Sequence, residues 1–114
     1  MVVDGLRDHV RGALVVFVTT SDEADAERIA GVLVEERLAA CVNIVGGIRS
    51  VYRWEGKVTT DREQLLIIKT FADRFDALKE KVLEEHTYDL PEIVALPIES
   101  GHHAYLDWLL QETR

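Results

Sequence analysis

Cysteine, proline and long apolar runs are all scarce in this chain of 114 residues, and each scarcity excludes a class of protein. The single cysteine, Cys41, cannot form an internal disulfide, so a disulfide-stapled secreted fold is excluded and a reducing cytoplasm is the expected compartment. The longest apolar run near the N-terminus, residues 13–18, is far shorter than the ~20 residues of a membrane helix. We therefore expect neither a targeting segment nor a membrane anchor.

Positive charge is also in short supply. Lys and Arg number 13 against 21 Asp and Glu, which gives a formal net charge of −8. Binding to phosphates needs clustered cations, so nucleic acids and anionic membranes are not expected partners. Apolar residues make up 47% of the chain and charged residues 30%, which is typical of a globular protein. A chain of this length can bury a real core, so no metal or cofactor is required for folding.

Only two prolines occur, Pro91 and Pro97, and they bracket one short segment near the end. No internal repeat, low-complexity stretch or Pro/Gly-rich linker divides the rest of the chain. Residues 1–11 mix charged and isolated apolar residues and are interpreted as a flexible N-terminal segment. Residues 12–114 are therefore predicted to form a single domain.

The hydrophobic periodicity predicts an α+β fold with the order β-α-β-β-α-β-α. Thr20 and Glu23 have the spacing of a capping box and would begin a helix that runs to about Leu38. The last helix is expected to turn Tyr105, Trp108 and Leu109 inward. Strands are predicted over residues 13–18, 42–55, 57–70 and 93–98, and helices over about 21–38, 74–85 and 102–112. The short, β-branched first strand is expected to be buried on both faces, and the last strand is expected to lie at a sheet edge or to stop at Pro97, which lacks an N–H donor. The first six elements form the split βαβ of a ferredoxin-like sandwich: an antiparallel sheet with two helices on one face, followed here by a C-terminal helix.

The second strand is unusually long. Fourteen residues from Val42 to Glu55 would extend for about 45 Å at ~3.3 Å per residue, against a diameter of roughly 35 Å for a compact domain of this size. The hairpin therefore either projects beyond its own domain or folds back at a bulge at residues 46–47. A projecting arm would expose Tyr52 and Trp54 unless a partner covered them. We predict a homo-oligomer in which these two residues belong to an inter-subunit hairpin.

Five separated blocks of this sequence occur in register from about Ala13 to Leu110 and are specific as a set. The blocks are residues 36–43 (ERLAACVN), 52–57 (YRWEGK), Glu63 with 67–70 (IIKT), 86–93 (HTYDLPEI), and 96–98 (LPI) with 101–109 (GHHAYLDWL). Together they resemble the CutA1 family of divalent-cation tolerance proteins.

The resemblance implies a compact homotrimer of ferredoxin-like subunits, similar in architecture to the PII nitrogen-signalling proteins, with the long hairpins packed edge to edge. It also implies a link to tolerance of copper and other divalent metals, and some members bind copper. Animal members are tied to membrane anchoring of acetylcholinesterase. No settled enzymatic activity is known for the family, so the chain is not expected to be an enzyme.

Cys41 and His86 are the candidate metal ligands, for copper or another divalent ion. A thiolate binds soft metals, although a small cysteine before a strand also packs as an apolar residue. His86 could ligate a metal or act as a partial cation at a helix C-terminus. The resemblance implies that copper-binding relatives hold the metal with a thiol on the first strand and two adjacent histidines. Here Val18 and Glu85 occupy two of those positions and only His86 matches.

The other polar and aromatic clusters have structural interpretations beside functional ones. His102 and His103 are neighbours in sequence and are interpreted as a surface feature, because adjacent helical residues do not chelate as i,i+4 pairs do. The charged residues of the hairpin could serve in acid/base chemistry or in cross-strand pairs, and pairing is the expected role. They are Glu55, Lys57, Glu63 and Lys69. Four aromatic residues could pack in the core or line an inter-subunit cleft: Tyr52, Trp54, Tyr88 and Trp108.

Two functions follow as hypotheses. The first is a cytoplasmic, homotrimeric metal-response protein of divalent-cation tolerance. The second is a PII-like signalling or scaffold trimer that binds a small metabolite or a protein partner at subunit clefts. RNA binding through the same strand order is excluded by the net charge of −8 and by the lack of an aromatic stacking motif with flanking basic residues.

Overall fold

The computed structural model describes residues 12–114, so the expected flexible segment 1–11 lies outside the described residues. Its strands are β1 (Ala13–Thr20), β2 (Cys41–Trp54), β3 (Lys57–Phe71) and β4 (Ile93–Pro97). Its helices are α2 (Glu23–Glu35), a short 3-10 turn η1 (Ala72–Arg74), α3 (Phe75–Glu85) and α4 (His103–Glu112). None of the helices between residues 12 and 114 is long and apolar enough to cross a membrane.

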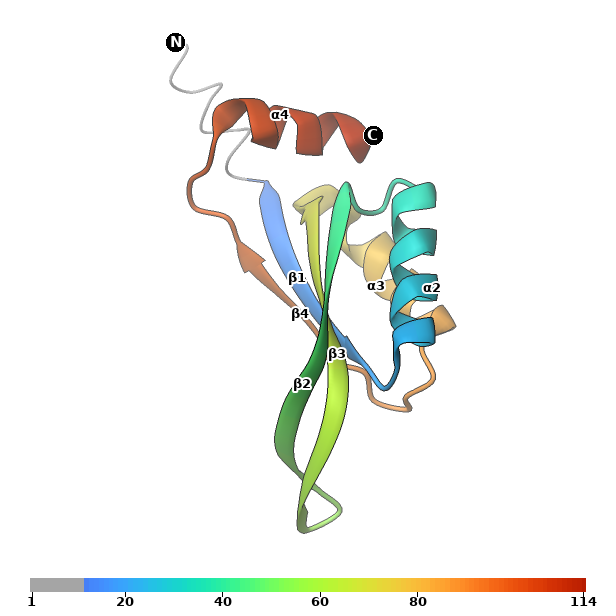
Figure 1. Ribbon diagram of the computed structural model, residues 1–114. Helices are drawn as coiled ribbons and strands as arrows, with labels where there is room; N and C mark the ends of the chain where they lie inside the picture. Colours follow the sequence, from blue (N-terminus) through green and yellow to red (C-terminus); the bar gives the residue numbers. More distant parts are fainter. Residues whose placement is uncertain (1–11) are drawn as a thin grey trace.

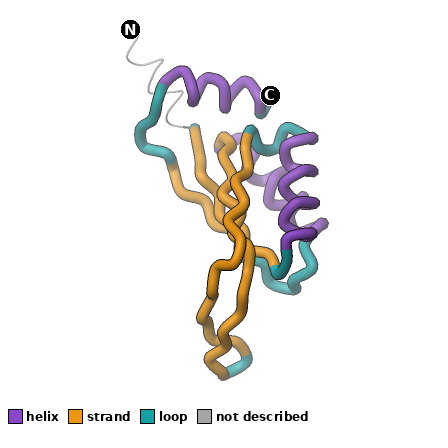
Figure 2. Tube along the Cα trace, viewed as in Figure 1, coloured by secondary structure: helices purple, strands orange, loops and turns teal. Residues whose placement is uncertain are grey.

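The four strands form one antiparallel sheet in the order β2-β3-β1-β4. Figures 1 and 2 show α2 and α3 on one face of this sheet, with α4 lying across one end. This arrangement confirms the α+β fold and the ferredoxin-like order with an added C-terminal helix. It also confirms that the strand ending at Pro97 lies at an edge, where a missing N–H donor is tolerated.

The main core fills the space between the sheet and the helices α2 and α3. Alternate residues of the two central strands point into it, because successive side chains of a strand face opposite sides. Val16 and Val18 of β1 meet Leu66 and Ile68 of β3 there, and all four are fully buried. Four further helix residues complete the cluster: Ile29, Leu33, Leu78 and Val82.

A second, smaller cluster lies under α4. Leu106 and Leu109 of that helix are buried against Ala13 and Phe71 at the end of the sheet. The prediction that Tyr105 and Trp108 point inward was wrong, since 41% and 42% of their surfaces are exposed. A helix lying flat across a sheet edge buries only a narrow stripe at i and i+3, and that stripe is the leucine pair.

Both predicted ends of the helix α2 were wrong by a few residues. The N-cap is Asp22 and not Thr20, because the Asp22 carboxylate accepts a hydrogen bond from the backbone N–H of Asp25 at 2.8 Å. The helix stops at Glu35 rather than Leu38. Arg37 adopts a left-handed φ of 59°, and the next two N–H groups fold back onto the carbonyl of Leu33.

The hairpin of β2 and β3 has a bulge and still projects from the domain. Val45 pairs with Leu65 and Ile48 with Glu63, so two glycines of β2 face one residue of β3. Gly47 has a φ of 70°, which a side chain would strain. The molecule nevertheless extends 54 × 26 × 22 Å with a radius of gyration of 15.4 Å, against ~13 Å for a compact domain. Figure 1 shows the hairpin running well past the rest of the sheet.

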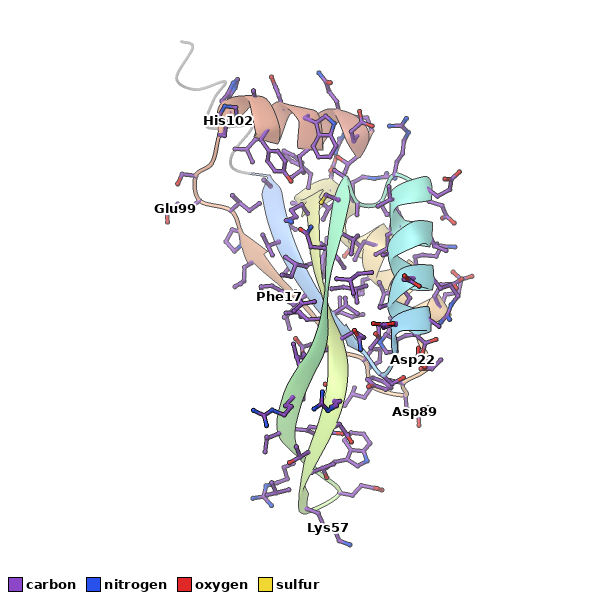
Figure 3. The ribbon with its side chains drawn as sticks, viewed as in Figure 1. Phe17, Asp22, Lys57, Asp89, Glu99 and His102 are labelled. Atoms are coloured by element: carbon purple, nitrogen blue, oxygen red, sulfur yellow. The ribbon has the colours of Figure 1, made fainter. Side chains whose placement is uncertain are left out.

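The sheet face opposite α2 and α3 carries apolar side chains that no helix between residues 12 and 114 covers. Phe17 lies between Ile67 of β3 and Val94 of β4 in register, and Figure 3 shows it on the side away from these helices. Val94 and Leu96 are 49% and 53% exposed. The prediction that the first strand is buried on both faces is therefore wrong for the single subunit, since Phe17 is only half-buried.

Candidate functional site

Cys41 begins β2, and its thiol lies among polar groups. Its Sγ is 3.9 Å from Oδ1 of Asn43 and 4.0 Å from Nζ of Lys69, which also donates to the same Asn43 oxygen. Burial raises the pKa of Tyr105 from α4, and the nearby Cys41 thiol adds to that rise. Cys41 itself is half-buried and lies outside both core clusters.

His86 caps the C-terminus of α3, and both of its ring nitrogens are engaged by the backbone. The N–H of Tyr88 donates to Nδ1 at 3.0 Å, which leaves the ring proton on Nε2, 2.7 Å from the carbonyl oxygen of Thr19. The ring also lies 4.7 Å from the Tyr88 ring. His86 therefore ties the segment after α3 to the end of β1, and a metal would have to displace one of these two hydrogen bonds.

The two candidate ligands are not brought together. In the sheet register Cys41 of β2 and Val15 of β1 both lie opposite Lys69 of β3. His86 instead contacts Thr19, four residues farther along β1. Four residues of strand separate the two levels by about 13 Å. Between residues 12 and 114, no three His, Cys, Asp or Glu residues are grouped so as to hold a metal ion.

The positions that match the other ligands of copper-binding relatives have structural roles here. Val18 is fully buried in the main core. Glu85 lies 3.4 Å from Nε of Arg28, which also bonds Asp25 at 2.7 Å. This pairing lowers the pKa of Asp25, mainly through the hydrogen bond from Arg28.

His102 has a role that the sequence did not reveal. It is the N-cap of α4, and its Nδ1 accepts a hydrogen bond from the backbone N–H of Tyr105 at 3.3 Å. An imidazole rarely serves as the cap, since Ser, Thr, Asp and Asn are preferred. The interpretation of His102 as a surface feature was thus incomplete, because the ring also closes the first turn of the helix.

A cavity of about 660 Å³ lies where the hairpin leaves the sheet. One wall is the outer half of β2, and the other is the loop between α3 and β4, with Thr19 of β1 at the end. The residues that line it are Thr19, Ser50, Val51, Tyr52, Arg53, Trp54, Glu63, Tyr88, Asp89, Leu90 and Glu92. Figure 3 shows Asp89 on this loop, on the side of the hairpin that faces α2 and α3. Tyr52 and Trp54, the predicted inter-subunit residues, both face this cavity.

Two tyrosines that line the cavity donate hydrogen bonds to carboxylates. The Tyr88 hydroxyl donates to Oε2 of Glu63 at 2.8 Å, and Glu63 is only 7% exposed. Burial and this hydrogen bond raise the pKa of Tyr88 well above its usual range. The Tyr52 hydroxyl donates to Asp61, and that bond is the main cause of the raised pKa of Tyr52.

The predicted cross-strand pairing holds for Lys69, whose Nζ donates to Asn43 on β2, but not for Glu63. Glu63 faces Ile48, and Asp61 faces Ser50. The partner of Glu63 comes from a loop 25 residues away, which no hairpin periodicity could indicate. Of the four aromatic residues considered for a cleft, Trp108 is elsewhere, 5.6 Å from the ring of Tyr105 on α4.

Comparison with known proteins agrees with this architecture. Residues 14–112 match the family described as CutA1 divalent ion tolerance protein. The chain belongs to the CutA1 family. Over 99 residues it is 56% identical to the divalent-cation tolerance protein CutA of Thermus thermophilus, covering 87% of this chain and 96% of that protein. It is 55% identical over 102 residues to Protein CutA 1, chloroplastic, of Oryza sativa, covering 90% of this chain.

The fold is shared with crystallised members of the CutA1 family. The structure of CutA1 from Oryza sativa superposes with a TM-score of 0.89 at 53% identity, covering 93% of this chain and 97% of that one. The chain spans 58% of the length of the curated rice protein, so that protein is considerably longer. The family is named for tolerance of divalent cations and not for a reaction.

Proposed function

We propose that this protein acts in divalent-cation tolerance as a homotrimeric metal-response protein, in the cytoplasm and without enzymatic activity. The observation that carries the homotrimer is the helix-free face of the sheet. Its central residue Phe17 and the exposed Val94 and Leu96 form a contiguous apolar surface, which a protein in water usually covers.

The sheet edges favour a closed ring of copies. Among the described residues β2 and β4 are the two edges of the sheet, and neither has a further strand on its outer side. An outer strand of one copy can pair with the opposite edge of the next, and such head-to-tail contacts form rings when the rotation closes. The resemblance to the family implies three copies. In such a ring, the projecting hairpin with Tyr52 and Trp54 would lie against a neighbouring subunit.

Sedimentation of two lysine variants tests the homotrimer. Leu96→Lys puts a charge on the helix-free face, and Leu83→Lys puts the same charge on α3 at a similar exposure, 53% against 48%. We expect the wild type and Leu83→Lys to sediment as trimers at micromolar concentration and Leu96→Lys to dissociate. A folded wild-type monomer at that concentration would contradict the proposal.

Direct metal binding is proposed at Cys41, with copper or another soft divalent ion as the ligand. Cys41 is half-buried and has the Asn43 oxygen nearby, whereas His86 must first give up a backbone hydrogen bond. We expect Cys41→Ser to abolish binding of Zn²⁺ and Cu²⁺ in calorimetry, and His86→Gln to have the smaller effect. Zn²⁺ is included because it cannot oxidise the thiol. Equal binding in wild type and Cys41→Ser would remove this cysteine from consideration.

A second candidate function is a PII-like scaffold or signalling trimer with a small-molecule ligand. The cavity of about 660 Å³ favours it, because its walls combine aromatic rings with a few fixed polar groups, as ligand pockets do. A thermal-shift screen of metals and metabolites separates the two functions, since a ligand that binds the folded state raises the unfolding temperature. Stabilisation by metals alone would favour the first function.

A further inference from the structure

We infer that the cavity at the base of the hairpin binds a small organic cation, with the Glu63 carboxylate as its counter-charge and the rings of Trp54, Tyr52 and Tyr88 as its walls. This inference rests on the small-molecule binding of the second candidate function, independently of the number of subunits, and names the class of ligand for it. It follows from three properties of the cavity: its charge, its aromatic lining and its fixed geometry.

The charge of the cavity is negative where a ligand would lie. The lining residues that carry a charge at neutral pH are Glu63, Asp89, Glu92 and Arg53, three acids against one base. The guanidinium of Arg53 is turned to the hairpin tip, where it donates to the carbonyl of Gly56 at 3.4 Å. Among the described residues no cation lies within ion-pair distance of Glu63. A carboxylate that is 7% exposed and has only a tyrosine hydroxyl as partner favours a cationic ligand.

The raised pKa values of Tyr52 and Tyr88 are consistent with this negative charge. The charges of Glu63 and Asp61 help to raise the pKa of Tyr88 and of Tyr52, after the larger effects of burial and hydrogen bonding. Like charges disfavour a phenolate, so a field that opposes a second negative charge here would attract a positive one.

The aromatic lining selects an organic cation over a hydrated metal ion. Trp54 and Tyr52 are 47% and 40% exposed in the single subunit, so a ligand could lie against part of each ring in the cleft between this hairpin and a neighbouring subunit. The π-face of an aromatic ring attracts a cation, and weakly hydrated ammonium groups are the usual ligands of such aromatic walls. In this cavity the acids Glu63, Asp89 and Glu92 are not grouped so as to hold a metal ion.

The far wall of the cavity is held in place by His86. Its two hydrogen bonds, to the carbonyl of Thr19 and from the N–H of Tyr88, fix the start of the loop that carries Tyr88. Tyr88 in turn holds Glu63 at 2.8 Å. The counter-charge is thus oriented before a ligand arrives, which reduces the entropy lost on binding.

Calorimetry with a matched pair of probes tests this inference on the full-length protein. Choline carries a quaternary ammonium, and 3,3-dimethylbutan-1-ol is its neutral carbon isostere. We expect choline to bind at least about tenfold more tightly than the alcohol, and the advantage to shrink as salt is added.

Two variants and one control locate the binding. Glu63→Gln removes the charge but keeps an oxygen that accepts from Tyr88, and we expect it to weaken choline binding about tenfold or more. Trp54→Leu changes a half-exposed ring, so it does not depend on core packing, and we expect a loss of about 2- to 30-fold. Glu99→Gln is the matched control, an exposed acid near the opposite end of the sheet from Asp89 (Figure 3), and should bind like wild type.

Three results would overturn the inference. They are equal binding of choline and the alcohol, equal losses in Glu63→Gln and Glu99→Gln, and Glu63-dependent binding of Zn²⁺ without binding of choline. Sedimentation of the same samples keeps the two proposals apart. Choline binding by a monomer would leave the cation site standing and refute the trimer, and a trimer that ignores choline would do the reverse.

Discussion

Replacing Tyr88 by phenylalanine removes one oxygen and tests the buried tyrosine–carboxylate pair. The hydroxyl donates to Oε2 of Glu63 at 2.8 Å, and Glu63 is 7% exposed. Hydrogen bonds to charged groups contribute about 1.5–3 kcal/mol, and a buried carboxylate left without its donor also loses solvation. The cavity opens onto Glu63 and gives water some access, so we expect the lower part of this range, about 1.5–2 kcal/mol.

Urea unfolding at one fixed protein concentration measures this cost, because the stability of an oligomer depends on concentration. Tyr52→Phe is the matched control. It makes the same chemical change at a hydroxyl whose partner, Asp61, is exposed, so a loss of at most about 1 kcal/mol is expected. Adding Glu63→Gln completes a double-mutant cycle, and the pair should show a coupling of about 1 kcal/mol. The reasoning is refuted if Tyr88→Phe costs no more than Tyr52→Phe.

Four further predictions use the same assay. Leu33→Ala, in the main core, should cost about 2–5 kcal/mol, and a loss below 1 kcal/mol would mean that the site collapses freely. Asp22→Ala should cost about 0.5–2 kcal/mol through the lost N-cap; no change would disprove that cap. Gly31→Ala, in a helix with open space, should stabilise by about 0.5–1 kcal/mol, whereas Gly47→Ala, at φ 70°, should destabilise by about 1 kcal/mol; effects of the same sign would contradict this contrast. The raised pKa of Tyr88 adds stability that is complete below about pH 10 and lost at higher pH, so an alkaline series should show a smaller decline in Tyr88→Phe than in wild type.

The order of elements could be predicted because it depends on local periodicity. The run at residues 13–18 and the alternation along the hairpin each indicate a strand without knowledge of their partners. The helix ends could not be placed as well. Thr20 and Asp22 are both good N-caps, and only the geometry of the chain leaving β1 decides that the carboxylate of Asp22 accepts the bond.

The orientation of α4 shows a different limit. An amphipathic pattern allows several inward stripes, and Tyr105 with Trp108 is as periodic as Leu106 with Leu109. The choice was decided by packing against Ala13 and Phe71, which lie far away in the sequence. The candidate site could not be predicted from the sequence for the same reason. Glu63 and Tyr88 could be named individually, but their pairing depends on where the loop after α3 meets the hairpin.

The sequence by itself determined the strand and helix order, the sheet-edge position of the last strand and the excess length of the hairpin. These follow from side-chain periodicity, from the missing N–H of Pro97 and from a fixed rise per residue, all of which act locally. Tertiary structure alone decided that both ring nitrogens of His86 form hydrogen bonds with the backbone and that Cys41 lies apart from His86. It also decided that Glu63 is buried beside aromatic rings. Those outcomes depend on contacts between segments distant in the chain, which local patterns do not specify.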